Sequence, residues 1–412
     1  MAQVPAPEPL TLGQALQAAR GNLDVVLARS ALVAAGADVT AADHAPLPVL
    51  SAKLGSIDLQ NGIGGGSLLG QKRIDKSLGV DWTWERGSKR ALRTQAARQA
   101  EAAAQADLED TTLQQLTAAH AAFFDLLAAQ ERLLQVSALE RSAAQLAATA
   151  ARRVQAGDLA AQDAARTGIE AQRARADVLS AQLERQRAAL ALRQLTGWTL
   201  PADSLQARAD WPGIGLDVAL PDLAVAVQSR ADVRAAQARL QAAQAALDGA
   251  TALKRTDVTL GASVDHFPGT STRLVEFRMQ MPLQWGYGYE GEIGRAQAQL
   301  TQAQAAQEKV LRTATGEMQR LQFEALASAQ RAQSYEADIL PRARKVAEGA
   351  EMAYSKGAMS LTDLLDARRV LRTTQIEALA ARTDAAKAAG AWQLRVRPET
   401  FLPHTTSTEF PK

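Results

Sequence analysis

Two carboxylates in the last quarter of the chain are the residues best placed to do chemistry. Asp363 and Asp366 are three residues apart, so on a helix they lie on one face. One interpretation is structural, because Ser360 and Asp363 have the spacing of a capping box and both acids would complement the helix dipole. The other interpretation is a functional acidic pair that attracts cations. These residues alone leave both interpretations open.

Other residue types that do chemistry are missing or isolated. The chain has no Cys, which excludes disulfides, thiol nucleophiles, cysteine zinc sites and a lipid-bearing cysteine. No Ser/His/Asp order, phosphate-binding loop or metal-ligand cluster is visible, so we expect no enzyme activity, no cofactor and no metal site. The histidines lack the i, i+4 spacing of helical metal sites, and we expect them to be ordinary surface or tip groups. They are His44, His120, His266 and His404.

The overall charge is nearly balanced. The 412 residues carry 46 Lys and Arg against 44 Asp and Glu, a formal net charge of +2. A nucleic-acid binder needs a concentrated basic face, so this balance argues against one. Hydrophobic residues make up 47% of the chain but aromatic residues only 4%. Ala supplies most of the apolar residues and fills little volume, so we expect no thick globular core.

A repeat organises the chain. Similar groups of residues recur about 200 positions apart in the same order, which is the signature of a repeated structural unit. Trp84 recurs as Trp285, and Gly157 recurs as Gly357. We predict an extended segment at 1–10, a first repeat at 11–200, a link at 201–217, a second repeat at 218–394 and a tail at 395–412.

Each half is predicted to fold as a helix, two strands, a very long helix, a turn and a returning helix. The first half has strands at about 49–60 and 76–86 and helices at about 87–153 and 159–196. The second half has strands at about 256–267 and 273–285 and helices at about 290–355 and 360–394. Pro341 predicts a kink near Leu340, because proline removes a helical hydrogen bond. Gly157 and Gly357 are predicted to form the turns.

The predicted strands alternate between apolar and polar residues, which is typical of a sheet with two different faces. Each has about ten residues, the length that crosses a bilayer when tilted. Met279 and Met281 belong to the apolar set, so we expect them to pack against lipid rather than relay copper. The stretch 71–76 is expected to be a solvated outer loop, with binding to anionic outer-leaflet groups as the alternative. Aromatic residues at strand ends are predicted to form an interfacial girdle: Trp82, Trp84, Phe267, Trp285 and Tyr287.

Membrane insertion of such strands requires more than one chain. Four strands cannot close a barrel or hide their edges in lipid. Two chains would give 8 strands and a filled interior, whereas three give 12 and leave a lumen. No run of about 18 uncharged apolar residues is visible, so no membrane-spanning helix is expected. Residues 1–10 lack the order of a secretory signal, which is therefore either absent or already removed.

Two other kinds of protein would also explain long Ala-rich helices. A soluble coiled-coil scaffold would account for the helices and the repeat, but it does not need alternating strands that end in Trp. A periplasmic adaptor-like protein has one long hairpin and no strands of bilayer length. The strands therefore favour a membrane protein.

The order of elements, given twice, resembles the TolC family of outer-membrane channel proteins over nearly the whole chain. The most specific match is YSKGAMSLTDLLDA, from Tyr354 to Ala367, which is similar to the family's periplasmic tip motif. The resemblance implies a mainly α fold with membrane β structure. It implies a homotrimer whose 12-stranded barrel, with four strands per chain, continues as a long α-helical coiled-coil barrel in the periplasm.

The function implied by this resemblance is passive export. The chain would form the outer-membrane channel of a tripartite efflux pump or a type I secretion system, gated at its periplasmic tip. Its partners would be a periplasmic adaptor (a membrane fusion protein), an inner-membrane pump and outer-membrane lipid. The exported substrate stays open among metal ions, drugs and proteins.

The resemblance also assigns roles at the tip. Asp363 and Asp366 match carboxylates that line the closed tunnel entrance, and threefold symmetry would turn each into a ring. Tyr354 resembles the tyrosine that latches the mobile helix pair, and Asp163 matches its acceptor. Met359 stands where some members carry a latch arginine, so we expect the latch here to have fewer bonds.

Overall fold

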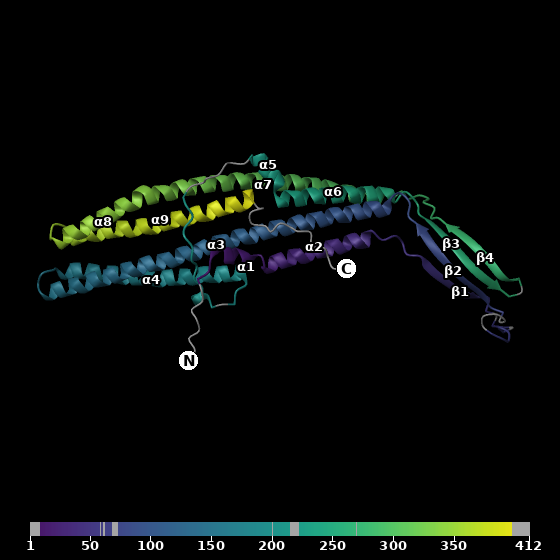
Figure 1. Ribbon diagram of the computed structural model, residues 1–412, viewed down its shortest axis with the longest axis horizontal. Helices are drawn as coiled ribbons and strands as arrows, with labels where there is room; N and C mark the ends of the chain where they lie inside the picture. Colours follow the sequence, from purple (N-terminus) through teal and green to yellow (C-terminus); the bar gives the residue numbers. More distant parts are fainter. Residues whose placement is uncertain are drawn as a thin grey trace. The chain divides into compact units, whose positions relative to one another are not determined.

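The computed structural model describes residues 9–57, 59–60, 62–67, 73–199, 201–214, 222–268 and 270–397. Most of these residues are helical, and four strands form one sheet (Figure 1). Contacts divide the chain into two compact units. The sheet unit comprises Arg29–Asp107 and Asp232–Val310, and the helical unit comprises Met1–Ala28, Leu108–Ala231 and Leu311–Lys412. Residues 71–72 of the predicted outer loop and 398–412 of the predicted tail lie outside the described residues, and the last two residues of that loop, 75–76, belong to a strand.

The sheet is antiparallel and follows the chain order. It consists of β1 (Val49–Gly55), β2 (Asp75–Trp84), β3 (Val258–Phe267) and β4 (Ser271–Gln280), in the order β1-β2-β3-β4. The first repeat therefore supplies one hairpin and the second repeat the other. The edge strands β1 and β4 each have a strand neighbour on one side only within the described chain.

The two faces of the sheet differ in the way that the sequence alternation predicts. One face exposes large apolar side chains, with Val80 48%, Trp82 54% and Trp84 59% exposed. The opposite face carries polar residues, of which Ser263 and Asp265 are buried. The apolar face has no covering layer among the described residues, so it is available to lipid.

The two edge strands, β1 and β4, are shorter than predicted. β1 ends before residue 60, and β4 ends at Gln280 rather than at residue 285. Pro282 has no N–H to donate to a strand ladder, which explains the early end of β4. Met281, Trp285 and Tyr287 consequently lie in the connection to the next helix and not in a strand.

Two long helices lead from the sheet unit into the helical unit. α3 (Lys89–Gln155) follows β2, and α7 (Glu290–Ser334) follows β4. Two further helices lead to the sheet, α2 (Leu23–Ala42) before β1 and α6 (Ala231–Ala252) before β3. Each hairpin is thus flanked by one incoming and one outgoing helix.

A search for uncharged apolar runs passes over α2, although this helix is long enough to cross a membrane. By length and composition α2 is apolar enough, with a mean hydropathy of 1.5, and only 6% of that stretch is buried. Asp24, Arg29 and Asp38 interrupt any uncharged run, but three charges leave the average hydropathy high. Gln115 on α3 donates a 2.9 Å hydrogen bond to Asp24, so α2 begins beside α3.

The helical unit contains two long hairpins. In the first, α3 turns back as α4 (Ala161–Thr196), and in the second, α8 (Leu340–Ser355) turns back as α9 (Leu361–Val396), which runs beside it (Figure 1). Shorter elements complete the unit: α1 (Leu12–Ala19), η1 (Ala202–Ser204) and α5 (Leu223–Ser229). Phe123 and Leu192 belong to the largest buried side chains, but much of the buried surface comes from Ala. Small alanines let the helices approach closely, and no thick core of large side chains is needed to bury these surfaces.

The second long helical stretch changes geometry at its proline. A π-helical turn, η2 (Tyr335–Ile339), separates α7 from α8, and Pro341 is the second residue of α8. A π-turn accommodates the hydrogen bond that proline removes without ending the helix. The predicted irregularity near Leu340 is therefore a wide turn in a continuing helix.

Candidate functional site

The two hairpin turns of the helical unit depend on glycine. Gly157, after α3, has φ +83°, and Gly357, after α8, has φ +72°. Both lie in the left-handed region, which glycine adopts without a Cβ penalty. The amide of Ala358 donates to the carbonyl of Ala353 at 2.9 Å, and Asp158 donates to Arg153 at 2.8 Å. The two turns therefore have the same helix-ending geometry, and each hairpin tip is compact.

Ser360 is the N-cap of α9, and Asp363 is its partner in the first turn. Ser360 Oγ accepts a 3.2 Å hydrogen bond from the Asp363 amide, and it donates to Asp363 Oδ2 at 2.7 Å. The N-cap predicted at Ser360 is therefore present, whereas the Asp363 carboxylate contacts the Ser360 hydroxyl and not its amide. A capping contact occupies one carboxylate oxygen and leaves the charge of Asp363 in place at the tip.

Asp366 has a cationic partner that the sequence analysis missed. Arg369 Nη1 lies 3.2 Å from Asp366 Oδ1, and the Asp366 side chain is 62% exposed. The i, i+3 spacing of these residues was the available signal. An acidic ring built from Asp366 would be partly neutralised by Arg369.

Tyr354 packs into an apolar cluster at the second hairpin tip. It contacts a buried group that includes Leu361 and Leu364, together with the partly buried Met359. Among the described residues its hydroxyl makes no hydrogen bond, and Asp163 lies in the first turn of α4. The structure therefore does not bring Tyr354 and Asp163 into a hydrogen bond, and the latch stays a prediction.

Arginines on α9 link the two hairpins instead. Arg369 Nη2 lies 3.4 Å from Glu170 Oε1 on α4, and Arg372 forms an ion pair with Asp177. We call these two pairs the α4–α9 ladder. Nearer the turn, Arg166 donates to the Thr362 hydroxyl at 3.1 Å, which adds a third α4–α9 contact. Sequence reasoning missed these residues because their partners are almost 200 positions away in the chain.

The ladder does not enclose a ligand site of ordinary size. The cavity beside it, between α3, α4, α8 and α9, has a volume of about 120 Å³ and is lined by residues such as Leu139, Leu365 and Arg368. Small-molecule sites measure roughly 300–1,000 Å³. The ladder is therefore better suited to holding the two hairpins together than to binding a solute.

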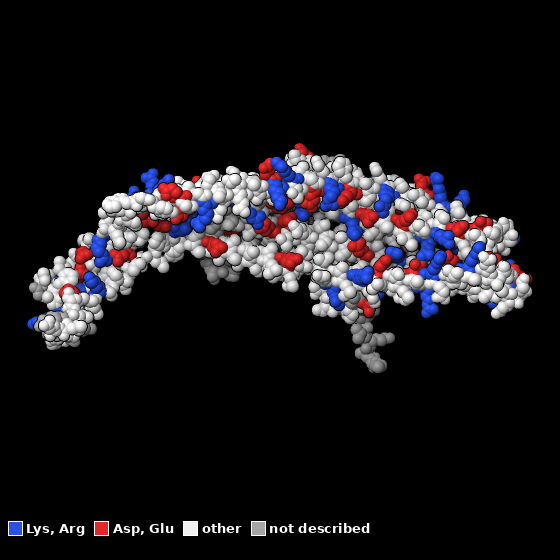
Figure 2. Space-filling model, turned by 180° about the vertical axis from the view of Figure 1, so that it is seen from behind, with Lys and Arg blue, Asp and Glu red and all other residues white. Residues whose placement is uncertain are grey.

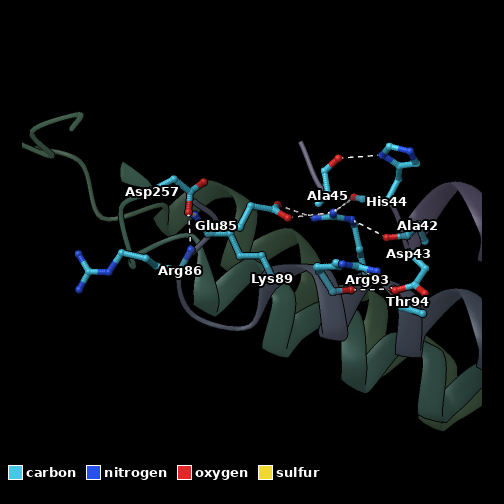
Figure 3. Close-up of polar contacts among 11 residues, drawn as sticks. Ala42, Asp43, His44, Ala45, Glu85, Arg86, Lys89, Arg93, Thr94 and Asp257 are labelled. Atoms are coloured by element: carbon cyan, nitrogen blue, oxygen red, sulfur yellow. Dashed lines mark hydrogen bonds and ion pairs between the residues drawn. The ribbon is translucent and has the colours of Figure 1, made fainter. Parts of the chain in front are cut away.

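A second polar centre lies in the sheet unit, where strands meet helices (Figure 3). Arg93 on α3 donates to the carbonyls of Ala42 (2.8 Å) and His44 (2.5 Å), which close the end of α2. The same guanidinium pairs with Glu85, just after β2, at 2.5 Å. The hydrogen bond to Glu85 raises the pKa of Arg93. One side chain thus joins the end of α2, the end of β2 and the start of α3.

The neighbouring ion pairs extend this junction to the second repeat. Lys89 lies 2.8 Å from Asp257, which precedes β3 and also accepts the Arg86 amide at 2.9 Å. On the other side, the hydrogen bond from Arg90 lowers the pKa of Asp43. Both hairpins of the sheet are therefore tied to the first turns of α3 (Figure 3).

Charges elsewhere are mixed in sign. On the face drawn in Figure 2, Lys and Arg side chains alternate with Asp and Glu side chains. The described part of that face offers no continuous basic surface of the kind that binds a nucleic acid. In the described ranges, no three His, Asp or Glu side chains group as ligands for a metal ion.

His120 is not the surface group that we expected. Its ring packs 4.9 Å from the ring of Phe124 and fits against Gly390, where an added Cβ would lie 2.0 Å from the imidazole. Burial lowers the pKa of His120 from 6.5 to about 4. The signal was the run of apolar residues that follows it on the same helix, Ala121 to Phe124.

Comparisons with known proteins agree with this architecture. A family model described as outer membrane efflux protein matches residues 15–198 and 223–391. Comparison with curated protein sequences found no match. Among solved structures, a membrane protein from Pseudomonas aeruginosa is 19% identical with a TM-score of 0.81, and the match covers 93% of this chain and 90% of that one.

Two further structures are similar. The CmeC outer membrane channel of Campylobacter jejuni is 17% identical with a TM-score of 0.77, covering 93% of this chain and 85% of that one. The outer membrane protein VceC of Vibrio cholerae is 20% identical with a TM-score of 0.76, covering 93% and 95%. These likenesses establish the fold, and the family match spans both repeats. The chain belongs to the outer membrane efflux protein family.

Proposed function

We propose that this chain supplies one third of a passive exit duct through the outer membrane. Membership of the outer membrane efflux protein family gives the location and the transport function, and it makes the chain a channel component rather than an enzyme. The observation that carries the proposal is the sheet, which has one apolar exposed face, one polar face and two edge strands. Such a sheet is stable in lipid only as part of a closed barrel.

Three chains fit these requirements best. Twelve strands close a barrel wide enough for a lumen, whereas eight leave an interior filled by side chains. A second surface also needs covering, because α2 exposes Leu23 (77%), Leu27 (67%) and Val33 (61%). Neighbouring copies of the chain would cover this surface as well as the edges of β1 and β4.

The partners follow from the family and from the direction of the helices. Channels of this family work with periplasmic adaptors and inner-membrane pumps. The two hairpin tips, at Gly157 and Gly357, lie at the helix ends far along the chain from the strands. With the sheet in the outer membrane, these tips would face the adaptor in the periplasm, and the pump would select the exported substrate.

We further propose that the tip controls opening. Asp363 and Asp366 are the candidate gate acids, and Tyr354, Asp163 and Met359 occupy the latch positions. The exposed Asp366 and Asp363, which accepts a hydrogen bond from the Ser360 hydroxyl, both keep a carboxylate at the start of α9. In a threefold assembly these acids would face each other across a narrow entrance and favour cations.

Single-channel recording tests this function. The purified protein in a planar bilayer should conduct, prefer cations and be blocked by divalent cations from the side of the helical tips. Replacing both gate acids, Asp363→Asn with Asp366→Asn, keeps their size and should weaken selectivity and block. A protein that inserts but does not conduct would refute the duct. A double variant with unchanged selectivity would refute the gate acids alone.

A further inference from the structure

Three cations lie where the apolar face of the sheet ends. Arg86 comes two residues after Trp84, the last residue of β2, and Lys254 and Arg255 precede β3. Trp84 pairs with Val258 across these strands, so the two chain segments lie at the same end of β2 and β3. We call Arg86, Lys254 and Arg255 the junction cations.

Side chains of the segment before β3 contact the backbone of the segment after β2. Arg255 lies directly against Gly87, where an added Cβ would be 2.9 Å from the Cβ and Cγ of Arg255. The amide of Arg86 donates to Asp257 at 2.9 Å. The segment before β3 therefore packs on the segment after β2, and the junction cations are neighbours in space.

The acids nearby are already paired with other cations. Asp257 pairs with Lys89, and Glu85 pairs with Arg93. Across the described ranges, no carboxylate forms an ion pair with a junction cation, and all three residues are exposed. Figure 3 shows the Arg86 guanidinium directed away from Lys89 and Arg93. These side chains thus present uncompensated positive charge beside an apolar surface.

Assembly into a barrel would leave this place open. β2 and β3 are the inner strands of the sheet, and subunits would join through the edge strands β1 and β4. The junction cations follow β2 and precede β3, so strand pairing between subunits does not cover them. Trp84, 59% exposed, lies next to them at the level expected of an interfacial aromatic residue.

We propose that the junction cations bind the phosphate headgroup of an anionic phospholipid in the leaflet that faces the periplasm. The inference rests on the proposed function, which places the sheet in the membrane and the helices in the periplasm. Basic residues next to a membrane surface attract anionic lipids, and long cationic side chains reach the headgroups while their stems pack on apolar surface. Trp84 would contact the upper part of the acyl chains.

Native mass spectrometry of the assembled protein in mild detergent tests the proposal. Cardiolipin and phosphatidylcholine are added separately, and the bound lipid is measured. A triple variant, Arg86→Gln, Lys254→Gln and Arg255→Gln, removes the junction cations. A matched control removes three exposed cations of the helical unit, through Arg153→Gln, Arg344→Gln and Lys345→Gln.

The wild type and the control should bind cardiolipin well above phosphatidylcholine, and the triple variant should bind it about tenfold more weakly. Equal binding by the triple variant, or an equal loss in the control, would overturn the proposal. If the triple variant does not assemble, Arg86→Gln alone should weaken cardiolipin binding about threefold, and an unchanged affinity would overturn the proposal. Failure of the wild type to conduct in a bilayer would count against the duct itself, whereas a conducting protein without lipid preference would count only against this site.

Discussion

Arg278 on β4 reaches across β3 to pair with Asp81 on β2, with Nη2 2.8 Å from Oδ1. The residue beneath this ion pair is Gly261, which is in register with both Asp81 and Arg278. A Cβ on Gly261 would lie 2.2 Å from the Asp81 carboxylate. Ser51 on β1 lies 3.4 Å from the other oxygen of Asp81, so polar contacts cross all four strands on one face.

Gly261→Ala should weaken the sheet. The added methyl group must push Asp81 or Arg278 aside, and overpacking of this kind costs roughly 1–3 kcal/mol. We expect the assembled protein to dissociate at a lower temperature, as measured by heating before gel electrophoresis. The matched control is Gly168→Ala on α4, where no atom lies within 4 Å of an added Cβ. Equal heat resistance of the two variants would show that the ion pair over Gly261 contributes nothing.

Arg93→Met should loosen the junction between strands and helices. The variant keeps the side-chain stem but leaves the carbonyls at the end of α2 without a donor and the Glu85 carboxylate, 16% exposed, without a cation. The Arg93 side chain is 37% exposed, so solvent screens the pair in part, and its loss should cost about 1–3 kcal/mol. Thermal unfolding followed by circular dichroism should show a clear loss of stability. Arg98→Met, an exposed position on the same helix, should change stability by less than about 0.5 kcal/mol.

The free energy of unfolding should fall as the pH drops from 6.5 toward 4, because His120 is protonated in the unfolded chain over this range. Burial lowers the pKa of this imidazole from 6.5 to about 4, so the unfolded chain binds a proton that the folded chain excludes. The stabilisation is fully present above pH 6.5 and is lost progressively toward pH 4. At pH 5 the loss is about 2 kcal/mol. His120→Gln should show a smaller drop in melting temperature between pH 7.5 and pH 5, and an equal drop would exclude His120 as the cause.

Removing the α4–α9 ladder should open the tip. Arg369→Gln with Arg372→Gln breaks the pairs to Glu170 and Asp177, so open times in single-channel recordings should lengthen. The variant also removes the Arg369 partner of Asp366, so cation selectivity is recorded beside open time. Each exposed pair contributes about 0.2–1 kcal/mol, which shifts the open population by a few fold. Arg320→Gln is the control, because it breaks an ion pair within α7 only.

The alternative latch is tested in the same recordings. Tyr354→Phe keeps the ring packed but removes the hydroxyl, and Asp163→Ala removes its predicted acceptor. If these two variants open the channel and the ladder variant does not, the tyrosine latch governs opening. If only the ladder variant opens it, arginines on α9 have replaced the latch arginine whose position Met359 occupies.

The fold was predictable where the sequence pattern is local. Alternation in β2 and β4 identified the strands, and Pro341 located the irregular turn between α7 and α8. The end of β4 was missed because the apolar alternation continues past Pro282, although the proline stops the ladder. The high average hydropathy of α2 was missed because Arg29 and Asp38 interrupt its apolar run.

Contacts between residues far apart in the sequence could not be predicted. Arg372 and Asp177 are 195 positions apart, and nothing near either residue indicates its partner. The burial of His120 depends on Gly390 of α9. Because glycine has no side chain, it leaves room there for the imidazole ring. Ser360 could be recognised as an N-cap because its partner Asp363 lies within one helical turn.

The number of chains in the assembled protein tests the central claim most directly. Four strands with two open edges should close only with other copies, and twelve strands leave a lumen. Mass measurement in mild detergent, by light scattering or native mass spectrometry, should give three chains. A monodisperse monomer that still inserts into lipid would contradict the account.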